Sequence, residues 1–351
     1  MVDKYLLILW FILCFILTGC IKEEKYIATP TVQYMITPQI KDYISTGEPN
    51  IKKSPYAPFT LDPEGNFYIA DDTIDSRMNI EKYNSQGNYI TGWIPEIKKR
   101  KKNCWFLERK HPISEQLTDI LADKENIYIA YGAAYNINFK EGNFPSDCIS
   151  HIEQFDLNGK FIIAIKPAYD SFHTYFIRYI TKDKNGNFYL ASDIHVEKYN
   201  ANWKLQSILN PFDPEKSKLQ PGVLIGDVAA DSQGYIYILL TSPDYYENGY
   251  VAKFDSFGKL VNKWNSEDKD KLIFCGLEID ADDNIYLLGI DRKDTYHIQK
   301  FYSNGIFITE WNTECTGELC FNPYNDMRID CKGNIYVASV KCTIKKFSPK
   351  Q

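Results

Sequence analysis

The chain has 351 residues, a formal net charge of −6 at neutral pH, 15% aromatic residues and 25% charged residues. An acidic balance of this kind argues against nucleic acid as a partner. The 26 tyrosines are typical of proteins rich in β-strand. The length would fit two domains, although all-β folds of this size are commonly one.

The chain begins with MVDKYLLILWFILCFILTGC. Its apolar run, Tyr5 to Leu17, is too short to cross a bilayer as a helix and fits the central region of a secretory signal. The run ends in Leu17-Thr18-Gly19-Cys20, which resembles the bacterial lipobox. The resemblance implies that residues 1–19 are removed and that Cys20 is acylated, which anchors the protein to a membrane. The alternative is an ordinary cleaved signal in which this Cys occurs by chance.

We therefore expect an extracytoplasmic lipoprotein with a short tether at residues 20–29. Ile21 stands where an inner-membrane retention signal would carry Asp. This favours the outer membrane if the host has one.

A segment of about ten residues recurs six times along the rest of the chain, for example as DKNGNFYLAS from Asp183. The copies begin at Asp62, Asp123, Asp183, Asp231, Asp280 and Asp330. A second shared element, such as VEKYNANWKL, follows most copies closely. The Asp-Gly-Asn part is typical of a tight turn, and the alternating residues on either side predict antiparallel strands. Each repeat therefore predicts four strands, and six repeats predict a radial array of small sheets.

These residues resemble NHL-type repeats, in which D-x-x-G-N-x-Y-V-A is followed by I-x-K-F-x-x-x-G. The resemblance covers residues from about 55 to 351 and implies an all-β, six-bladed propeller of four-stranded antiparallel blades. The last repeat ends at Gln351 without a fourth strand. We expect part of residues 29–44 to supply that strand and close the ring, so that the propeller domain covers 30–351.

The turn at Asp183 has some features of a calcium loop. A helix-loop-helix calcium site needs Gly at position 6 and Glu at position 12. Counting from Asp183, Gly falls at position 4 and Ile194 at position 12. The residues inside the six turns also vary freely, so the turns are interpreted as structural. Three histidines share one column of the repeats, at His151, His195 and His297, but on separate blades they are expected to lie too far apart to share a metal.

In such a meander the Asp-Gly turns all lie at one end of the blades, here called the turn end. The other end, the loop end, receives the longest connections, Pro95–Thr118 and Gly132–Ser150. Cys104 and Cys148 lie in these two connections and are our first candidates for a disulfide. Binding commonly resides in loops on a rigid frame.

The first of these connections also carries a basic run. It consists of Lys98, Lys99, Arg100, Lys101 and Lys102. The run favours contact with an anionic surface, or it is a solvated loop tip.

The innermost strands are expected to line a central channel. Counting four residues back from the turn Asp places Asp119, Asp227 and Asp326 at one height on alternate blades. Three converging carboxylates predict a divalent cation site, with calcium as the candidate ion. The alternative is that each Asp binds nearby backbone amides and fixes its strand. Neighbouring channel positions hold the other candidate residues, Tyr179, Glu278 and Arg328.

The sequence thus favours a binding scaffold at the cell envelope, with a protein, peptide or glycan as ligand and no required cofactor. The alternative is a metal-dependent propeller enzyme, resembling lactonases or streptogramin-type lyases, with its chemistry at the channel mouth. RNA binding, known for some NHL proteins, conflicts with export and with the acidic charge.

Overall fold

The structure is a computed structural model that describes residues 57–71, 79–95, 114–135, 147–168, 177–212, 224–241, 249–265, 272–291, 293, 295–316, 327–339 and 343–347. All of them belong to one compact unit, Pro38–Gln351. Every regular element in them is a β-strand, and none of their segments is a helix long and apolar enough to cross a membrane. Cys20, the tether, the expected closing strand, the basic run, Cys104 and Asp326 lie outside the described residues.

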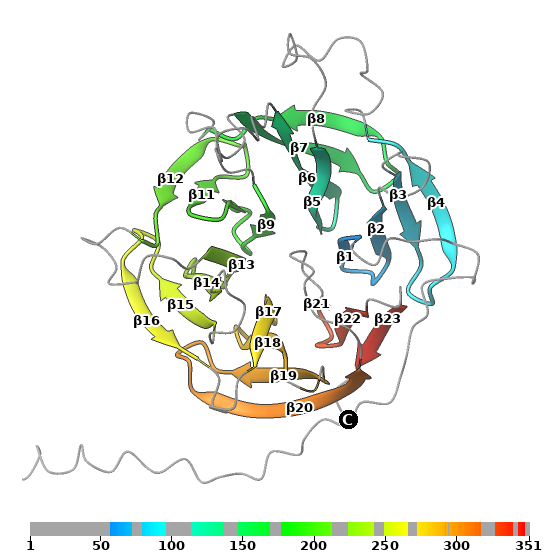
Figure 1. The fold of residues 1–351 in the computed structure, drawn as a ribbon. Coiled ribbons are helices and arrows are strands. Elements are labelled where there is room, and N and C mark those ends of the chain that lie inside the picture. The colour runs from blue at the N-terminus through cyan, green and yellow to red at the C-terminus, as the bar shows by residue number, and fades with distance from the viewer. Residues whose placement is uncertain are drawn as a thin grey trace, which may run out of the picture. The chain divides into compact units, whose positions relative to one another are not determined.

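The strands form six antiparallel sheets arranged around an axis, which confirms a six-bladed β-propeller (Figure 1). Blade 1 contains β1 (Phe59–Leu61), β2 (Phe67–Asp71), β3 (Asn79–Tyr83) and β4 (Tyr89–Trp93). Blade 2 contains β5 (Ser114–Ala122), β6 (Asn126–Tyr135), β7 (Asp147–Asp156) and β8 (Phe161–Ile165). Blade 3 contains β9 (Tyr179–Lys182), β10 (Phe188–Ala191), β11 (Val196–Tyr199) and β12 (Leu205–Leu209).

The other three blades repeat this order. Blade 4 contains β13 (Leu224–Ala230), β14 (Ile236–Thr241), β15 (Tyr250–Phe254) and β16 (Leu260–Trp264). Blade 5 contains β17 (Ile273–Ile279), β18 (Ile285–Ile290), β19 (Thr295–Phe301) and β20 (Phe307–Thr316). Blade 6 has three strands among the described residues, β21 (Met327–Ile329), β22 (Ile335–Ser339) and β23 (Thr343–Phe347).

The turn at Asp183 shows how each repeat folds locally. Oδ1 of Asp183 accepts hydrogen bonds from the backbone N–H groups of Asn185 (2.9 Å) and Asn187 (2.8 Å). Gly186 has φ +83°, a left-handed conformation that glycine adopts without a steric penalty. Oδ2 of the same Asp accepts a bond from the hydroxyl of Tyr189 (3.0 Å) on the next strand. The turn therefore folds through its own hydrogen bonds, as the structural interpretation predicts.

Six apolar clusters hold the ring together, one at each interface between neighbouring blades. The last joins Tyr336 and Ile344 of blade 6 to Phe59 and Phe67 of blade 1, so the described cores run all the way round. The inner-strand residues three positions before each turn Asp are at most 3% exposed, so they belong to these cores. Burying each large apolar side chain stabilises the fold by about 1.5–3 kcal/mol.

Candidate functional site

The turn end of the axis contains a cavity of about 150 Å³ to which all six blades contribute. Its lining residues lie one to three positions before the turn Asp of each repeat, so the cavity sits near the turns. Glu278 and Arg328, which the sequence predicted among the channel residues, both line this cavity. They stand two positions before their turn Asp, as Thr60 and Thr181 do, so their strand position places them there.

Arg328 joins three blades across the axis. Its Nη2 donates to Oδ1 of Asp119 (2.9 Å) on β5, and its Nη1 donates to Oε1 of Glu278 (3.1 Å) on β17. The guanidinium also donates to the backbone carbonyls of Met327 and Ile120. Most N–H groups of Arg328 are thus already hydrogen-bonded within the protein.

The two described aspartates of the predicted trio bind backbone amides. Asp119 accepts from the N–H of Ile120 (2.8 Å) and, in the next blade, from that of Ile180 (2.9 Å). Asp227 repeats the pattern with Val228 (2.7 Å) in its own blade and Leu277 (2.8 Å) in the next. Each carboxylate therefore fixes two neighbouring inner strands, as the structural alternative describes.

Three carboxylates share one guanidinium in this cluster, and burial disfavours their charged forms. Burial raises the pKa of Glu278 to about 7, with Arg328 opposing the shift and Asp119 adding to it. Burial and then the like charge of Glu278 raise the pKa of Asp227 well above its ordinary range. Burial also raises the pKa of Asp119, although Arg328 opposes it.

The charged form of Arg328, by contrast, is favoured. Burial works against the charge on Arg328, but the carboxylates of Asp119, Glu278 and Asp227 outweigh it and raise its pKa. Tyr179 lies fully buried near the cluster. Its pKa is also raised, by burial first and then by Asp227.

The predicted calcium site is not assembled by the described residues. They contain no group of three His, Cys, Asp or Glu side chains placed to hold a metal. The third member of the trio, Asp326, lies outside them, so a cation bound by all three stays a prediction.

Two histidines of the predicted column, His195 and His297, contact groups of their own blades rather than one another. His195 lies between the hydroxyl of Ser192 (2.8 Å from Nδ1) and the carboxylate of Glu197 (3.3 Å from Nε2). Ser192 and Glu197 are fully buried, so this serine is not presented to a substrate. His297 contacts the carboxylates of Asp291 and Glu310 within its own blade.

Cys148 lies on strand β7, opposite Ala134, rather than in a loop as expected. Its expected partner, Cys104, is outside the described residues, so their disulfide stays a prediction. Cys331 is an exposed free thiol.

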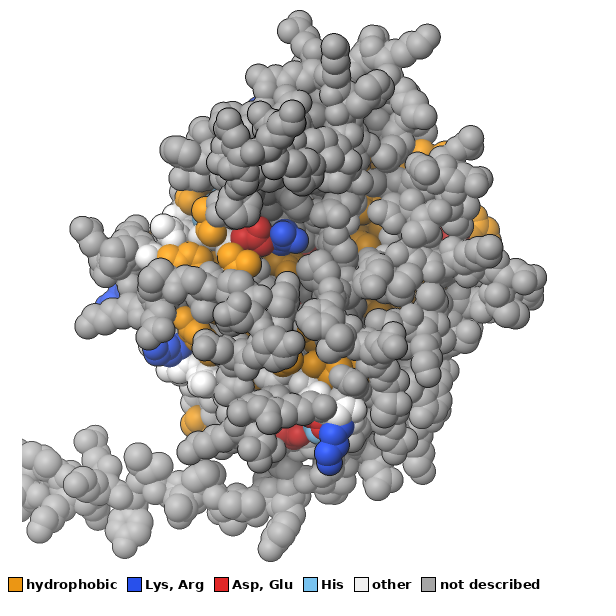
Figure 2. All heavy atoms as spheres, viewed as in Figure 1, with side chains coloured by type: hydrophobic (Ala, Val, Ile, Leu, Met, Phe, Trp, Pro, Cys, Tyr) orange, Lys and Arg blue, Asp and Glu red, His pale blue; other side chains and the backbone are white. Residues whose placement is uncertain are grey.

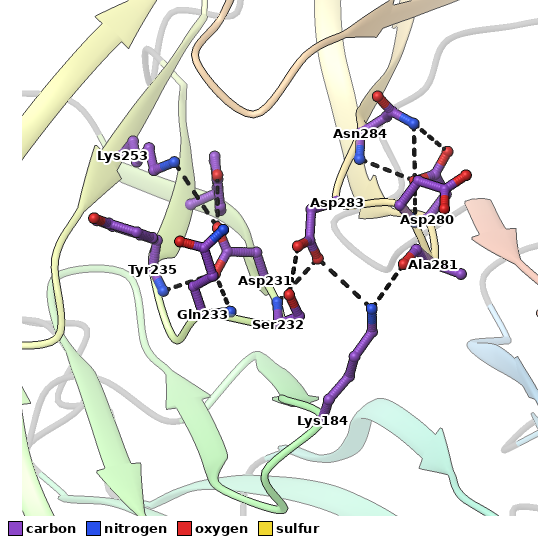
Figure 3. A network of polar contacts seen from close by, with 12 residues as sticks. Lys184, Asp231, Ser232, Gln233, Tyr235, Lys253, Asp280, Ala281, Asp283 and Asn284 are labelled. Atoms are coloured by element: carbon purple, nitrogen blue, oxygen red, sulfur yellow. Dashed lines mark hydrogen bonds and ion pairs between the residues drawn. The ribbon is translucent and has the colours of Figure 1, made fainter.

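A second polar network joins the turns of blades 3, 4 and 5 (Figure 3). Asp283 accepts bonds from the N–H (3.0 Å) and hydroxyl (2.5 Å) of Ser232, while Lys184 reaches the carbonyl of Ala281 (2.7 Å). Asp283 has φ +62° where four other repeats place a glycine. The sequence signal for this network is the one repeat of full turn length that carries Asp in place of the turn glycine.

Opposite charges are also paired elsewhere on the ring. Arg178 lies 2.5 Å from Asp193, and Lys300 lies 3.2 Å from Asp280. Figure 2 shows an acidic and a basic side chain next to each other among apolar side chains on one face.

The fold and the axial cluster define a β-propeller with a charged central cavity. No family model and no curated protein matches the sequence. A protein of unknown function from Dyadobacter fermentans is similar in structure, with a TM-score of 0.58, 9% identity, and 89% of this chain and 99% of that one covered. A protein of unknown function from Bacteroides caccae aligns with a TM-score of 0.45 and 12% identity over 74% of this chain and 82% of that one. These likenesses concern the fold alone, and the resemblance to NHL repeats stays a prediction.

Proposed function

We propose that this chain is a lipid-anchored, extracytoplasmic binding propeller that holds a protein, peptide or glycan at its loop end. The supporting observation is the shape of blade 2. Strand β6 has ten residues, whereas the second strands of the other blades have four to six. β6 starts directly after its turn, so the extra length projects at the loop end.

The extension is a continuous three-stranded platform. β6 pairs with β7 as far as Tyr135 and Asp147, and with β5 as far as Ala134 and Ser114. Backbone hydrogen bonding holds such a platform rigid, which lowers the entropy lost when a partner binds.

The test uses residues 21–351 on peptide and glycan arrays. In a shortened variant, Asn-Gly replaces residues 136–146, since a two-residue turn can join the paired ends Tyr135 and Asp147. We expect at least tenfold weaker binding of the array ligand by this variant. Phe257→Ser, at the turn end and 88% exposed in the native chain, is the control and should bind normally. Equal binding by the shortened variant would contradict the proposed face.

The anchor has its own test. Cells expressing the full chain should incorporate labelled palmitate into the protein, and Cys20→Ala should abolish the label. Label that persists in Cys20→Ala would contradict acylation at this position.

The second candidate function is a metal-dependent hydrolase or lyase. The raised pKa of Glu278 favours it, because shifted carboxyl groups in cavities are common in active sites. A lactone panel with added calcium or manganese tests it. Turnover that is lost in an Asp119→Asn, Asp227→Asn double variant of normal stability would replace the binding proposal.

A further inference from the structure

Exposed apolar side chains concentrate on the outer rim of the ring, near its turn end. Nine large apolar side chains are exposed among the described residues. Eight of them lie in the turn between a third and a fourth strand, or in the first three residues of the fourth strand, which starts at the turn end. These eight are Tyr89, Ile90, Ile162, Ile163, Phe257, Val261, Tyr302 and Ile306. Single exposed apolar residues are ordinary, but a set gathered at one end of a molecule indicates a contact surface.

The eight side chains surround the axis rather than forming a patch on one side. They belong to the outer parts of blades 1, 2, 4 and 5, which lie on different sides of the ring (Figure 1). A strand rises about 3.3 Å per residue, so side chains in its first three positions lie within about 10 Å of the turn end. A flat surface placed against the turn end therefore reaches all eight, whereas a partner on one side of the ring reaches only some of them.

The charges beside these side chains are basic, although the protein as a whole is acidic. Lys160, Lys204 and Lys259 occupy the same position in three outer turns, directly before the fourth strand, and all three are exposed. The carboxylates of the same turns, Asp156 and Asp255, are only partly exposed, and each accepts two backbone N–H bonds. Exposed lysines beside exposed apolar side chains are the combination that an anionic lipid surface binds.

The inner turns, between the first and second strands, add no net charge at this end. Their exposed charged residues are three acids and three lysines, namely Glu64, Glu125, Asp282, Lys124, Lys184 and Lys332. The excess of positive charge at the turn end therefore comes from the outer turns, where the apolar side chains also lie.

The expected lipid anchor would enter the ring at the same end. β23 ends at Phe347, which pairs with Ile335 directly after the turn of blade 6, so a fourth strand antiparallel to β23 begins at the turn end. If residues within 29–44 form that strand, the tether of residues 20–29 joins the ring there and spans at most about 35 Å. This part of the argument rests on the proposed anchor, whereas the apolar and basic side chains do not.

We propose that the turn end docks on an anionic phospholipid bilayer. The apolar side chains of the outer rim enter the headgroup region, whose depth of about 5–10 Å matches their height above the turns. Lys160, Lys204 and Lys259 contact the lipid phosphates. The platform of blade 2, at the other end of the ring, then faces away from the membrane and is open to its ligand.

The test is flotation of residues 21–351, which contain the whole compact unit, with lipid vesicles. We expect binding to vesicles of phosphatidylcholine and phosphatidylglycerol that weakens as salt is added, and much weaker binding to phosphatidylcholine alone. This protein carries no lipid, so the result is independent of acylation at Cys20 and of ligand binding at the loop end. No binding to the anionic vesicles at low salt would overturn the proposal.

A double variant, Phe257→Ser with Ile306→Ser, tests the apolar contact. The two native side chains are 88% and 59% exposed, so their replacement leaves the core intact. Binding to the anionic vesicles should weaken roughly tenfold or more. Ile208→Ser is the matched control, because Ile208 is the ninth exposed apolar side chain and lies in the loop-end half of β12; it should bind as the native chain does. Equal binding by the double variant would overturn the proposal.

Two measurements separate a bilayer from a second copy of the chain as the occupant of this rim. Phe257→Trp should gain fluorescence that brominated lipid quenches, whereas Ile208→Trp should gain fluorescence that it does not quench. Sedimentation should show a monomer for both the native chain and the double variant. A native dimer that the double variant dissociates, without quenching of Phe257→Trp, would replace the bilayer by self-association.

The lysines are tested by replacing Lys160, Lys204 and Lys259 together with Gln. This triple variant should lose the preference for anionic vesicles. The basic run, residues 98–102, is the rival contact because it is predicted at the loop end. Gln at all five of its positions should weaken vesicle binding less than the triple variant does, although it removes more charge. A larger loss from the basic run would place the loop end on the membrane and overturn the proposal.

Discussion

At the scale of single residues, Glu278 shows most clearly how burial and charge compete. Its carboxylate bonds Arg328, yet it also lies near the carboxylate of Asp119, and the pKa rises to about 7. In the unfolded chain the same group titrates near 4.5. The folded state therefore holds more protons than the unfolded state between these values, and this contribution to stability is lost as the pH rises through about 7.

Glu278→Gln isolates that contribution because Gln does not titrate. The free energy of unfolding of the native chain, relative to the variant, should fall by about 1–3 kcal/mol from pH 5 to pH 8. Urea unfolding at the two pH values measures it. A difference that stays constant, or grows with pH, would show that Glu278 has no raised pKa.

Asp283 adopts a left-handed conformation that costs a non-glycine residue about 1 kcal/mol. Its two hydrogen bonds to Ser232 offset that cost. Asp283→Ala keeps the strain and loses the bonds, so it should destabilise the protein by about 2 kcal/mol. Asp283→Gly loses the bonds but relieves the strain, and should destabilise it less. Thermal unfolding of both variants provides the ranking, and the reverse order would contradict this explanation.

At the scale of one element, each turn is tied to the strand that follows it. In all six blades the second strand places a tyrosine hydroxyl on the turn Asp, as Tyr189 does on Asp183. A lysine amino group lies over each tyrosine ring, as Lys198 lies 5.4 Å from the ring centre of Tyr189. Hydrogen bond and cation–π contact together fix the strand to its turn.

Tyr189→Phe removes one such bond while keeping the ring. We expect a loss of about 1 kcal/mol in the free energy of unfolding, because the carboxylate of the buried Asp183 loses a hydrogen-bond donor. Tyr302→Phe is the matched control, since its side chain is half exposed, and should have little effect. Equal effects of the two substitutions would contradict a role for the hydroxyl.

The turns could be predicted from the sequence because their Asp and Gly act on residues two to four positions away. The tyrosine and lysine contacts could not, because they depend on register between strands. Blade 2 shows this well: its third strand has Gln154 in the lysine column, and Lys182 from blade 3 lies over Tyr128 instead. Aligning the repeats with one another does not reveal this contact, because the lysine comes from the neighbouring blade.

At the scale of the whole molecule, Arg328 ties blade 6 to blades 2 and 5 through the axis. Arg328→Met would leave the carboxylates of Asp119 and Glu278 without their buried counter-ion. Breaking a buried pair in this way costs about 3–5 kcal/mol. Urea unfolding should show that loss, while Lys332→Met, at an exposed turn of the same blade, should be neutral. A neutral Arg328→Met would show that the axial tie does not stabilise the ring.

Closure of the ring can be tested by truncation. If residues within 29–44 supply the fourth strand of blade 6, removal of residues 21–45 exposes a sheet edge. The melting temperature should then fall by several degrees relative to residues 21–351. An unchanged melting temperature would contradict closure by this segment.

The six repeats determine the ring and the residues that line its axis. They do not determine which charged side chains meet there, because the Arg328 and Asp119 contact joins residues 209 positions apart. The alternating column of aspartates predicted both a cation site and a set of strand ties. Only the positions of the backbone amides of Ile180 and Leu277 show that Asp119 and Asp227 serve as ties.

A single measurement separates a binding propeller from a metal-dependent enzyme. Crystals of residues 21–351 grown with manganese would be measured at the manganese absorption edge. We predict no anomalous peak beside Asp119 and Asp227, because backbone amides occupy both carboxylates and Arg328 also binds Asp119. A peak bonded to both aspartates would contradict the binding propeller and make the axis a metal centre.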